Sequence, residues 1–186
     1  METGFKTETF SLEMDAARYA AEYTDAERFL SLCKSCPFYG TAWSCPPFEE
    51  DARGIWKKYR IIRLLARKII LSEELLSRTY TAEELSAFSA ELLKPFKAAL
   101  CGELLQAERE NPKSMALFPG RCELCAVCAR KAGESCRFPE RMRPSPEALG
   151  ADLGRTVSLF PGQSLLWGKD GHLPEYYFLI GALLLP

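Results

Sequence analysis

The segment Cys122-Glu123-Leu124-Cys125-Ala126-Val127-Cys128, closed by Cys136, is the stretch around which the chain is expected to fold. Its first three cysteines have the spacing CxxCxxC, and seven residues separate Cys128 from Cys136. Thiolates are soft ligands, and four of them suit zinc or an iron–sulfur cluster. Because chance rarely places structural thiols this close together, we predict a four-cysteine metal site here.

The spacing favours a [4Fe–4S] cluster over zinc. A zinc site usually combines two separate CxxC pairs, or CxxC with histidines, and this sequence has one histidine, His172. Three closely spaced cysteines can instead bind three corners of a cubane, as in the similar run of bacterial ferredoxins. In that run the fourth cysteine comes sooner and proline follows it at once, whereas Arg137 and Phe138 precede Pro139 here. Zinc is therefore kept as the alternative.

A second cysteine group lies earlier in the chain and consists of Cys33, Cys36 and Cys45. Prolines and a glycine fill the same stretch: Pro37, Gly40, Pro46 and Pro47. These residues exclude a regular helix or a central strand, so the stretch is predicted to be a stiff loop. Such a loop can hold three soft ligands in fixed positions, which predicts a second metal or cluster site. A plain dithiol or a zinc knuckle is the alternative.

The fourth ligand of this second group is left open by the sequence. Cys101 is the one unassigned cysteine, but it lies in a helical stretch, where a lone cysteine is more often a small buried apolar residue. Without a fourth cysteine, a cluster would have one open iron able to bind a substrate. This variant predicts a pocket beside the loop, walled by Tyr39, Trp43 and Phe48.

Length and composition indicate one domain over residues 1–186, since no low-complexity linker interrupts the chain. A net charge of −1 gives no argument for nucleic acid or an acidic membrane as partner. No signal peptide is recognisable, and the longest apolar run, 176–185, is too short to cross a bilayer. We therefore expect a cytoplasmic protein, in whose reducing environment eight cysteines indicate metal or redox chemistry.

Apolar periodicity and capping patterns predict an α+β fold. It would consist of an antiparallel or mixed sheet, helices packed on one side of it, and two cysteine-rich metal-binding loops. Strands are predicted at 5–12, 61–70, 114–118, 163–167 and 175–184, the last two joined as a hairpin through 168–171. Helices are predicted at 15–23, 25–32, 49–59, 72–78, 82–93, 146–149 and 152–160, with a further piece to 109 beyond a break or kink at Pro95. Thr24 and Thr81, each three residues before a glutamate, are the predicted N-caps of two of them.

Three motifs in combination resemble those of a known family. They are CxxC-Pro-x-Tyr-Gly-x-x-Trp-x-Cys-Pro-Pro at 33–47, CxxCxxC with Cys-Arg-x-Pro-Glu at 122–140, and Arg-Pro-Ser-x-Glu-Ala-x-Gly-x-Asp at 143–152. From about residue 24 to its end, the chain is similar to a family of predicted metal-binding proteins, a domain of unknown function of bacteria and archaea. The resemblance implies that the metal ligands are Cys33, Cys36, Cys45, Cys122, Cys125, Cys128 and Cys136. Cys101 does not map onto the family pattern, and the family implies metal binding without a reaction.

The sequence leads to three function hypotheses. The first is a cytoplasmic iron–sulfur protein with one or two [4Fe–4S] clusters, which acts in electron transfer or redox handling with a partner protein or a small-molecule substrate. The second is a structural zinc-binding module for protein interaction. The third is a thiol redox protein that uses Cys33 and Cys36, which Pro37 and the lack of a thioredoxin-like pattern disfavour. No catalytic residue is assigned, and no nucleotide-binding or hydrolase motif is present.

Overall fold

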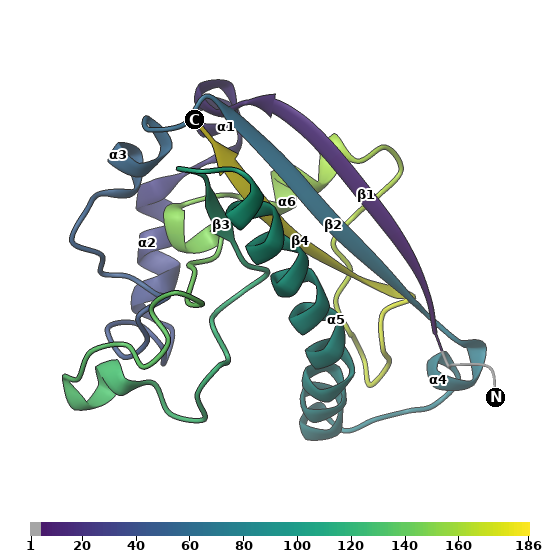
Figure 1. The fold of residues 1–186 in the computed structure, drawn as a ribbon. Helices are drawn as coiled ribbons and strands as arrows, with labels where there is room; N and C mark the ends of the chain where they lie inside the picture. Colours follow the sequence, from purple (N-terminus) through teal and green to yellow (C-terminus); the bar gives the residue numbers. More distant parts are fainter. Residues whose placement is uncertain (1–4) are drawn as a thin grey trace.

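A four-stranded antiparallel sheet forms the centre of the computed structural model, which describes residues 5–186 (Figure 1). Its strands are β1 (Phe5–Asp15), β2 (Ile61–Leu71), β3 (Met115–Leu117) and β4 (Tyr176–Leu185), in the order β1-β2-β4-β3. Each neighbouring pair is antiparallel. The predicted α+β class and four of the five predicted strands are thus confirmed, and the sheet is antiparallel rather than mixed.

The apolar residues of the two long central strands occupy both faces of the sheet. On one face Ile62, Leu64 and Ala66 of β2 lie beside even-numbered apolar residues of β1 and β4. On the other face Leu65 of β2 and Leu183 of β4 join a second cluster. Because side chains alternate across a strand, both faces must be covered to bury these residues.

Helices therefore cover both faces of the sheet, and the prediction of helices on one side is wrong. The first face packs against α1 (Ala16–Tyr23), α3 (Ala52–Trp56), η2 (Glu147–Leu149), α6 (Leu153–Thr156) and η3 (Val157–Leu159). The opposite face packs against α5 (Ala82–Glu110), which buries Leu100 and Leu104. Figure 1 shows α5 crossing the sheet on this side. The short α4 (Glu73–Leu76) follows β2.

Helix α5 begins with the predicted capping box and runs on through Pro95. The Glu84 amide donates to Thr81 Oγ1 at 3.2 Å, and the Thr81 amide donates to the Glu84 carboxylate at 2.8 Å. The predicted break at Pro95 is wrong, because the helix is continuous to Glu110. Pro95 is exposed, and the next residue, Phe96, packs edge-on against Phe5 at 5.0 Å. Packing of the helix on the sheet outweighs the loss of one backbone hydrogen bond.

Helix α2 (Ala26–Lys34) carries the chain into the first cysteine group. Its N-cap is Asp25, which accepts from the Arg28 amide at 3.1 Å, so the predicted cap at Thr24 is wrong by one residue. Thr24 instead forms a β-bridge with Ala151, and its hydroxyl donates to Ala20 O at 2.6 Å at the end of α1. Asp25 itself has a non-helical backbone, with φ −144° and ψ 82°, and its amide donates to Gly150 O at 2.8 Å, so the helix starts only after it.

Several predicted elements are shorter than expected, and one is absent. Residues 163–167 form no strand. Between the two halves of the predicted hairpin, an isolated β-bridge joins Lys169 to His172. Leu165 packs on the apolar face of the sheet instead. The predicted helices 49–59 and 152–160 are reduced to α3 and to α6 with η3. In the part of the chain that the structure describes, no helix combines the length and apolarity needed to cross a membrane.

Candidate metal centre

The two cysteine groups lie in neighbouring loops at one side of the sheet. We call residues 33–47 the first cysteine loop and residues 121–143 the second cysteine loop. Figure 1 shows them close together beside the lower end of α2, far from β1. All eight cysteines are free thiols; Cys36 is exposed, and the other seven are partly buried. The structure therefore brings the two predicted groups into one region.

The first cysteine loop is a chain of tight turns that begins in the last turn of α2. Cys33 lies within that helix, and its carbonyl accepts from the Cys36 amide at 2.9 Å. Gly40 has a φ of 67°, a left-handed conformation that few other residues adopt easily. Its amide donates to Pro46 O at 2.8 Å and so closes the loop around Cys45. This agrees with the stiff loop predicted from the prolines and the glycine.

All four cysteines of the second cysteine loop line one cavity of about 260 Å³. Residues 121–128 form one wall of it, and Cys136 and Phe138 belong to another. The short helix η1 (Ala129–Ala132) separates these two segments. Trp43 and Ser44 of the first cysteine loop complete the lining. Four thiols on one cavity are a donor set that fits zinc or an iron–sulfur cluster.

Polar contacts fasten the two loops to each other. The buried Ser44 hydroxyl accepts from the Cys122 amide at 3.0 Å, and the Trp43 indole donates to Glu134 O at 3.0 Å. Ser44 directly precedes Cys45. One hydrogen bond therefore links the neighbour of the last cysteine in the first group to the first cysteine in the second group.

Arg130 makes the largest number of these contacts. Its guanidinium donates to Ala42 O at 3.0 Å, to Cys45 O at 2.7 Å and to Pro47 O at 2.6 Å. The same group lies over the Trp43 ring, 4.9 Å from its centroid. One side chain of η1 thus satisfies three carbonyls of the first cysteine loop.

The electrostatic surroundings divide the thiols into the two predicted groups. Burial raises the pKa of Cys33, and the thiols of Cys45 and Cys36 raise it further. Burial likewise raises the pKa of Cys122, with Cys136, Cys125 and Cys128 adding to the shift. Burial also raises the pKa of Cys45, which the Ser44 hydroxyl and the cations Arg121 and Arg130 oppose. The thiols that raise the pKa of Cys33, Cys45 and Cys122 belong in each case to the same cysteine loop.

Cys101 lies beside the second group rather than the first. Burial in α5 raises its pKa to about 12, and the nearby charges are those of Lys97, Cys122 and Glu123. It also packs with the cluster of Leu100 and Leu104. Its surroundings are those of a buried apolar residue, as the sequence suggested.

Across residues 5–186, no three His, Cys, Asp or Glu side chains converge closely enough to hold one metal ion. A tetrahedral zinc site needs sulfurs about 2.3 Å from a single ion, and hence about 4 Å from one another. A four-iron cluster binds each thiolate through a different iron and accepts a wider arrangement. The thiols share a cavity without forming a single-ion cage.

The pocket predicted beside the first cysteine loop is split in the structure. Tyr39 and Phe48 line a cavity of about 350 Å³ with residues of α2 and α3, and no cysteine contributes to it. Trp43 instead faces the cavity of the second group. The three predicted wall residues therefore line two different cavities.

Most arginines of the second cysteine loop are engaged within the protein. Arg143 forms a bidentate ion pair with Glu108 of α5, with its Nε 2.8 and 3.0 Å from the two carboxylate oxygens. Arg137 donates to Val127 O at 3.0 Å. Arg130 and Ser44 could not be identified from sequence patterns, because their roles depend on contacts between loops about 80 residues apart. Their only local signal is position beside a cysteine.

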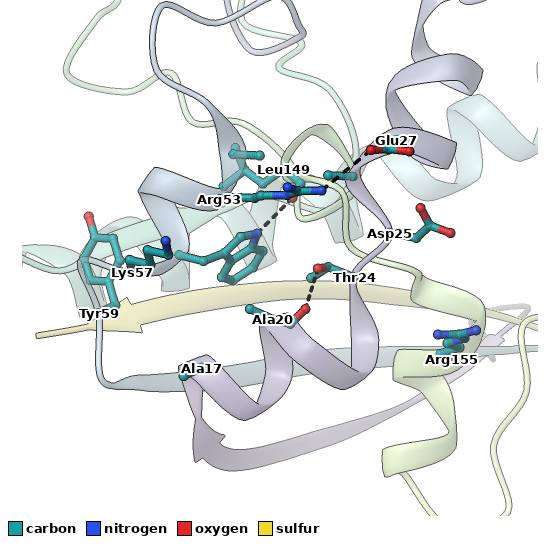
Figure 2. A pocket seen from close by; sticks show the side chains of 13 residues that line it. Ala17, Ala20, Thr24, Asp25, Glu27, Arg53, Lys57, Tyr59, Leu149 and Arg155 are labelled. Carbon is teal, nitrogen blue, oxygen red and sulfur yellow. Dashed lines mark hydrogen bonds and ion pairs between the residues drawn. The ribbon is translucent and has the colours of Figure 1, made fainter.

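A cavity without cysteines lies among α1, α2 and α3 (Figure 2). It has a volume of about 700 Å³ and a floor of small residues that includes Ala17 and Ala20. Figure 2 shows Arg53 directed toward Glu27, with which it forms an ion pair. The two groups are 3.8 Å apart, and the Trp56 indole donates to Leu149 O at 2.9 Å. Lys57, Arg155 and Asp25 add charges of both signs. This mixed rim selects no ligand class.

Comparison with known proteins agrees with the sequence motifs. No curated protein and no solved structure matches the chain. The family described as predicted metal-binding protein, domain of unknown function 2284, matches residues 19–185, and the chain therefore belongs to this family.

Proposed function

We propose that the chain is an iron–sulfur protein whose four thiols in the second cysteine loop bind one [4Fe–4S] cluster. The observation that carries the proposal is the cavity of about 260 Å³ lined by Cys122, Cys125, Cys128 and Cys136. The CxxCxxC spacing of the first three, with a remote fourth cysteine, favours a cluster over zinc. The bound cluster would supply reversible one-electron transfer.

The first cysteine loop is proposed to hold a second cluster or metal through Cys33, Cys36 and Cys45. Support comes from its rigid turns and from the contacts of Ser44 and Arg130 with the second cysteine loop. Two metal groups bound to these loops would be neighbours, an arrangement suited to passing electrons.

The role proposed is redox exchange with a partner protein in the cytoplasm. Apolar side chains stand in solvent beside the cysteines: Val127, between Cys125 and Cys128, is 61% exposed, and Phe38 is 36% exposed. Exposed apolar residues next to a redox group provide a contact surface without a barrier of protein between donor and acceptor.

Anaerobic purification with iron, sulfide and zinc analysis and an absorption spectrum tests the proposal. About four iron and four sulfide per chain indicate one cluster, and about eight of each indicate two. Cys125→Ser is expected to abolish the cluster of the second loop, whereas Cys101→Ser is the matched control and keeps full iron content. Zinc without sulfide would overturn the proposal and favour the structural zinc module.

A further inference from the structure

A large cavity lies along the free edge of β4, away from the cysteine loops. β3 pairs with β4 only at 182–184, so residues 176–181 of β4 have no strand on that side within the described chain. The space beside this edge is lined by residues 177–180 of β4, by α5 and by residues 165–168. Its volume is about 840 Å³, within the range of small-molecule sites.

The walls of this β4-edge cavity are mostly apolar. Leu85 and Leu93 of α5 line it, together with Phe178 and Ile180 of β4. At its rim stands Trp167, whose side chain is 80% exposed. A large indole in solvent beside an apolar cavity is available to cover the body of a bound molecule.

Two charged side chains line the cavity, and they differ in how they are neutralised. Lys97 is engaged, since its Nζ lies 3.0 Å from Glu123 Oε1. Glu147 is paired only in part: hydrogen bonds from the Ser145 side chain and from its own backbone reach the carboxyl, whereas its buried Oε2 has no hydrogen-bond partner within residues 5–186. An unpaired carboxyl oxygen in such surroundings is costly unless a donor reaches it. The cavity therefore lacks one cationic donor group.

We propose that the β4-edge cavity binds a small molecule with an apolar body and a primary ammonium head, and that Glu147 receives this head. The apolar walls would take the body, and the carboxylate would gain the charge-assisted hydrogen bond that it lacks. A carboxylate ligand would face Glu147 and find Lys97 already paired. No cysteine lines the cavity, so its ligand would not contact the proposed cluster.

Calorimetric titration of the full chain with octylamine, octanol and octanoate tests the proposal. Octylamine is expected to bind one molecule per chain, tighter than octanol and at least tenfold tighter than octanoate, below the concentrations at which these compounds aggregate. Glu147→Gln is expected to weaken octylamine about tenfold or more and to leave octanol nearly unchanged. Glu140→Gln is the matched control, because it removes a carboxylate from an exposed loop position. This variant should bind octylamine as the natural chain does.

A second variant separates binding from folding. Ser86 is exposed and lines the cavity, so Ser86→Trp fills the space without burying a polar group. It is expected to abolish octylamine binding with an unchanged circular dichroism spectrum. Octanoate binding as tightly as octylamine, or full octylamine affinity in either Glu147→Gln or Ser86→Trp, would overturn the proposal.

Discussion

At the scale of single residues, Arg130 is the side chain on which the geometry of the two cysteine loops depends. It donates to three carbonyls of the first cysteine loop from a position two residues after Cys128. A guanidinium can satisfy several acceptors in one plane, which a lysine ammonium on a flexible stem does less well. The residue therefore ties the positions of one set of thiols to those of the other.

Arg130→Lys is accordingly expected to destabilise the protein and to reduce its metal content, although charge is kept. Loss of two of the three hydrogen bonds to partly buried carbonyls should cost about 1–3 kcal/mol in the free energy of unfolding. Urea denaturation and iron analysis of the anaerobic protein measure the two effects. Arg141→Lys is the matched control, because Arg141 contacts only the Phe138 ring, at 5.8 Å. Equal stability of both variants would show that Arg130 does not join the loops.

At the scale of elements, α5 tolerates a proline that an isolated helix would not. Pro95 interrupts the backbone hydrogen bonds of a 29-residue helix, yet the helix continues on both sides of it. Pro95 is exposed, so its ring contributes little burial. Packing of the helix against the sheet offsets the free-energy cost of the missing hydrogen bond.

Pro95→Ala should therefore stabilise the protein. Proline in a helix interior costs about 3 kcal/mol relative to alanine in host helices, and part of this should be recovered, about 1–2 kcal/mol. For a chain of this size the melting temperature would rise by several degrees. Glu91→Ala, an exposed position one turn earlier in the same helix, controls for the gain of an alanine. A lower melting temperature for Pro95→Ala would mean that the proline ring itself supports the fold.

Elements defined by local signals could be predicted from the sequence, whereas those decided by distant contacts could not. The Thr81–Glu84 capping box and strand β2 depend on neighbours in the chain, and both were recognised. The segment 163–167 has the composition of a strand, but Leu165 is buried on the face of the sheet instead of pairing with β4. The N-cap of α2 is Asp25 rather than Thr24 because the Asp25 amide is bonded to Gly150, more than 100 residues away.

The same distinction holds for the candidate metal centre. The cysteine spacing predicted two groups of thiols, and the structure places each group within one loop. The contacts that join the loops, from Ser44, Trp43 and Arg130, connect residues that the sequence separates widely. No periodicity or spacing rule reports such a contact.

At the scale of the whole molecule, the fold separates a rigid centre from chemistry at its margin. Both faces of the sheet are covered by helices. The cysteine loops lie outside the three apolar clusters, whereas the β4-edge cavity is lined by members of these clusters, among them Phe178 and Ile180. Glu147, on the short helix η2, lies between these regions: it lines the cavity, and its charge contributes to raising the pKa of Cys33. A change in its charge should therefore affect the stability of the fold as a whole.

Glu147→Gln is expected to stabilise the ligand-free protein, and the gain should depend on pH. Burial raises the pKa of Glu147 above its ordinary value, so the folded state binds the proton more tightly than the unfolded state. The natural chain thus loses stability as pH rises from the unfolded pKa, about 4.3, through the folded pKa, while the glutamine variant does not. Urea denaturation from about pH 5 to about pH 8 should show the advantage of the variant growing with pH, toward about 1–3 kcal/mol. Because this gain is measured without ligand, it is independent of the octylamine titration, and Glu140→Gln should show no such trend. An advantage that stays constant with pH would mean that the pKa of Glu147 is the same in the folded and unfolded states, and would contradict the rise expected from its burial.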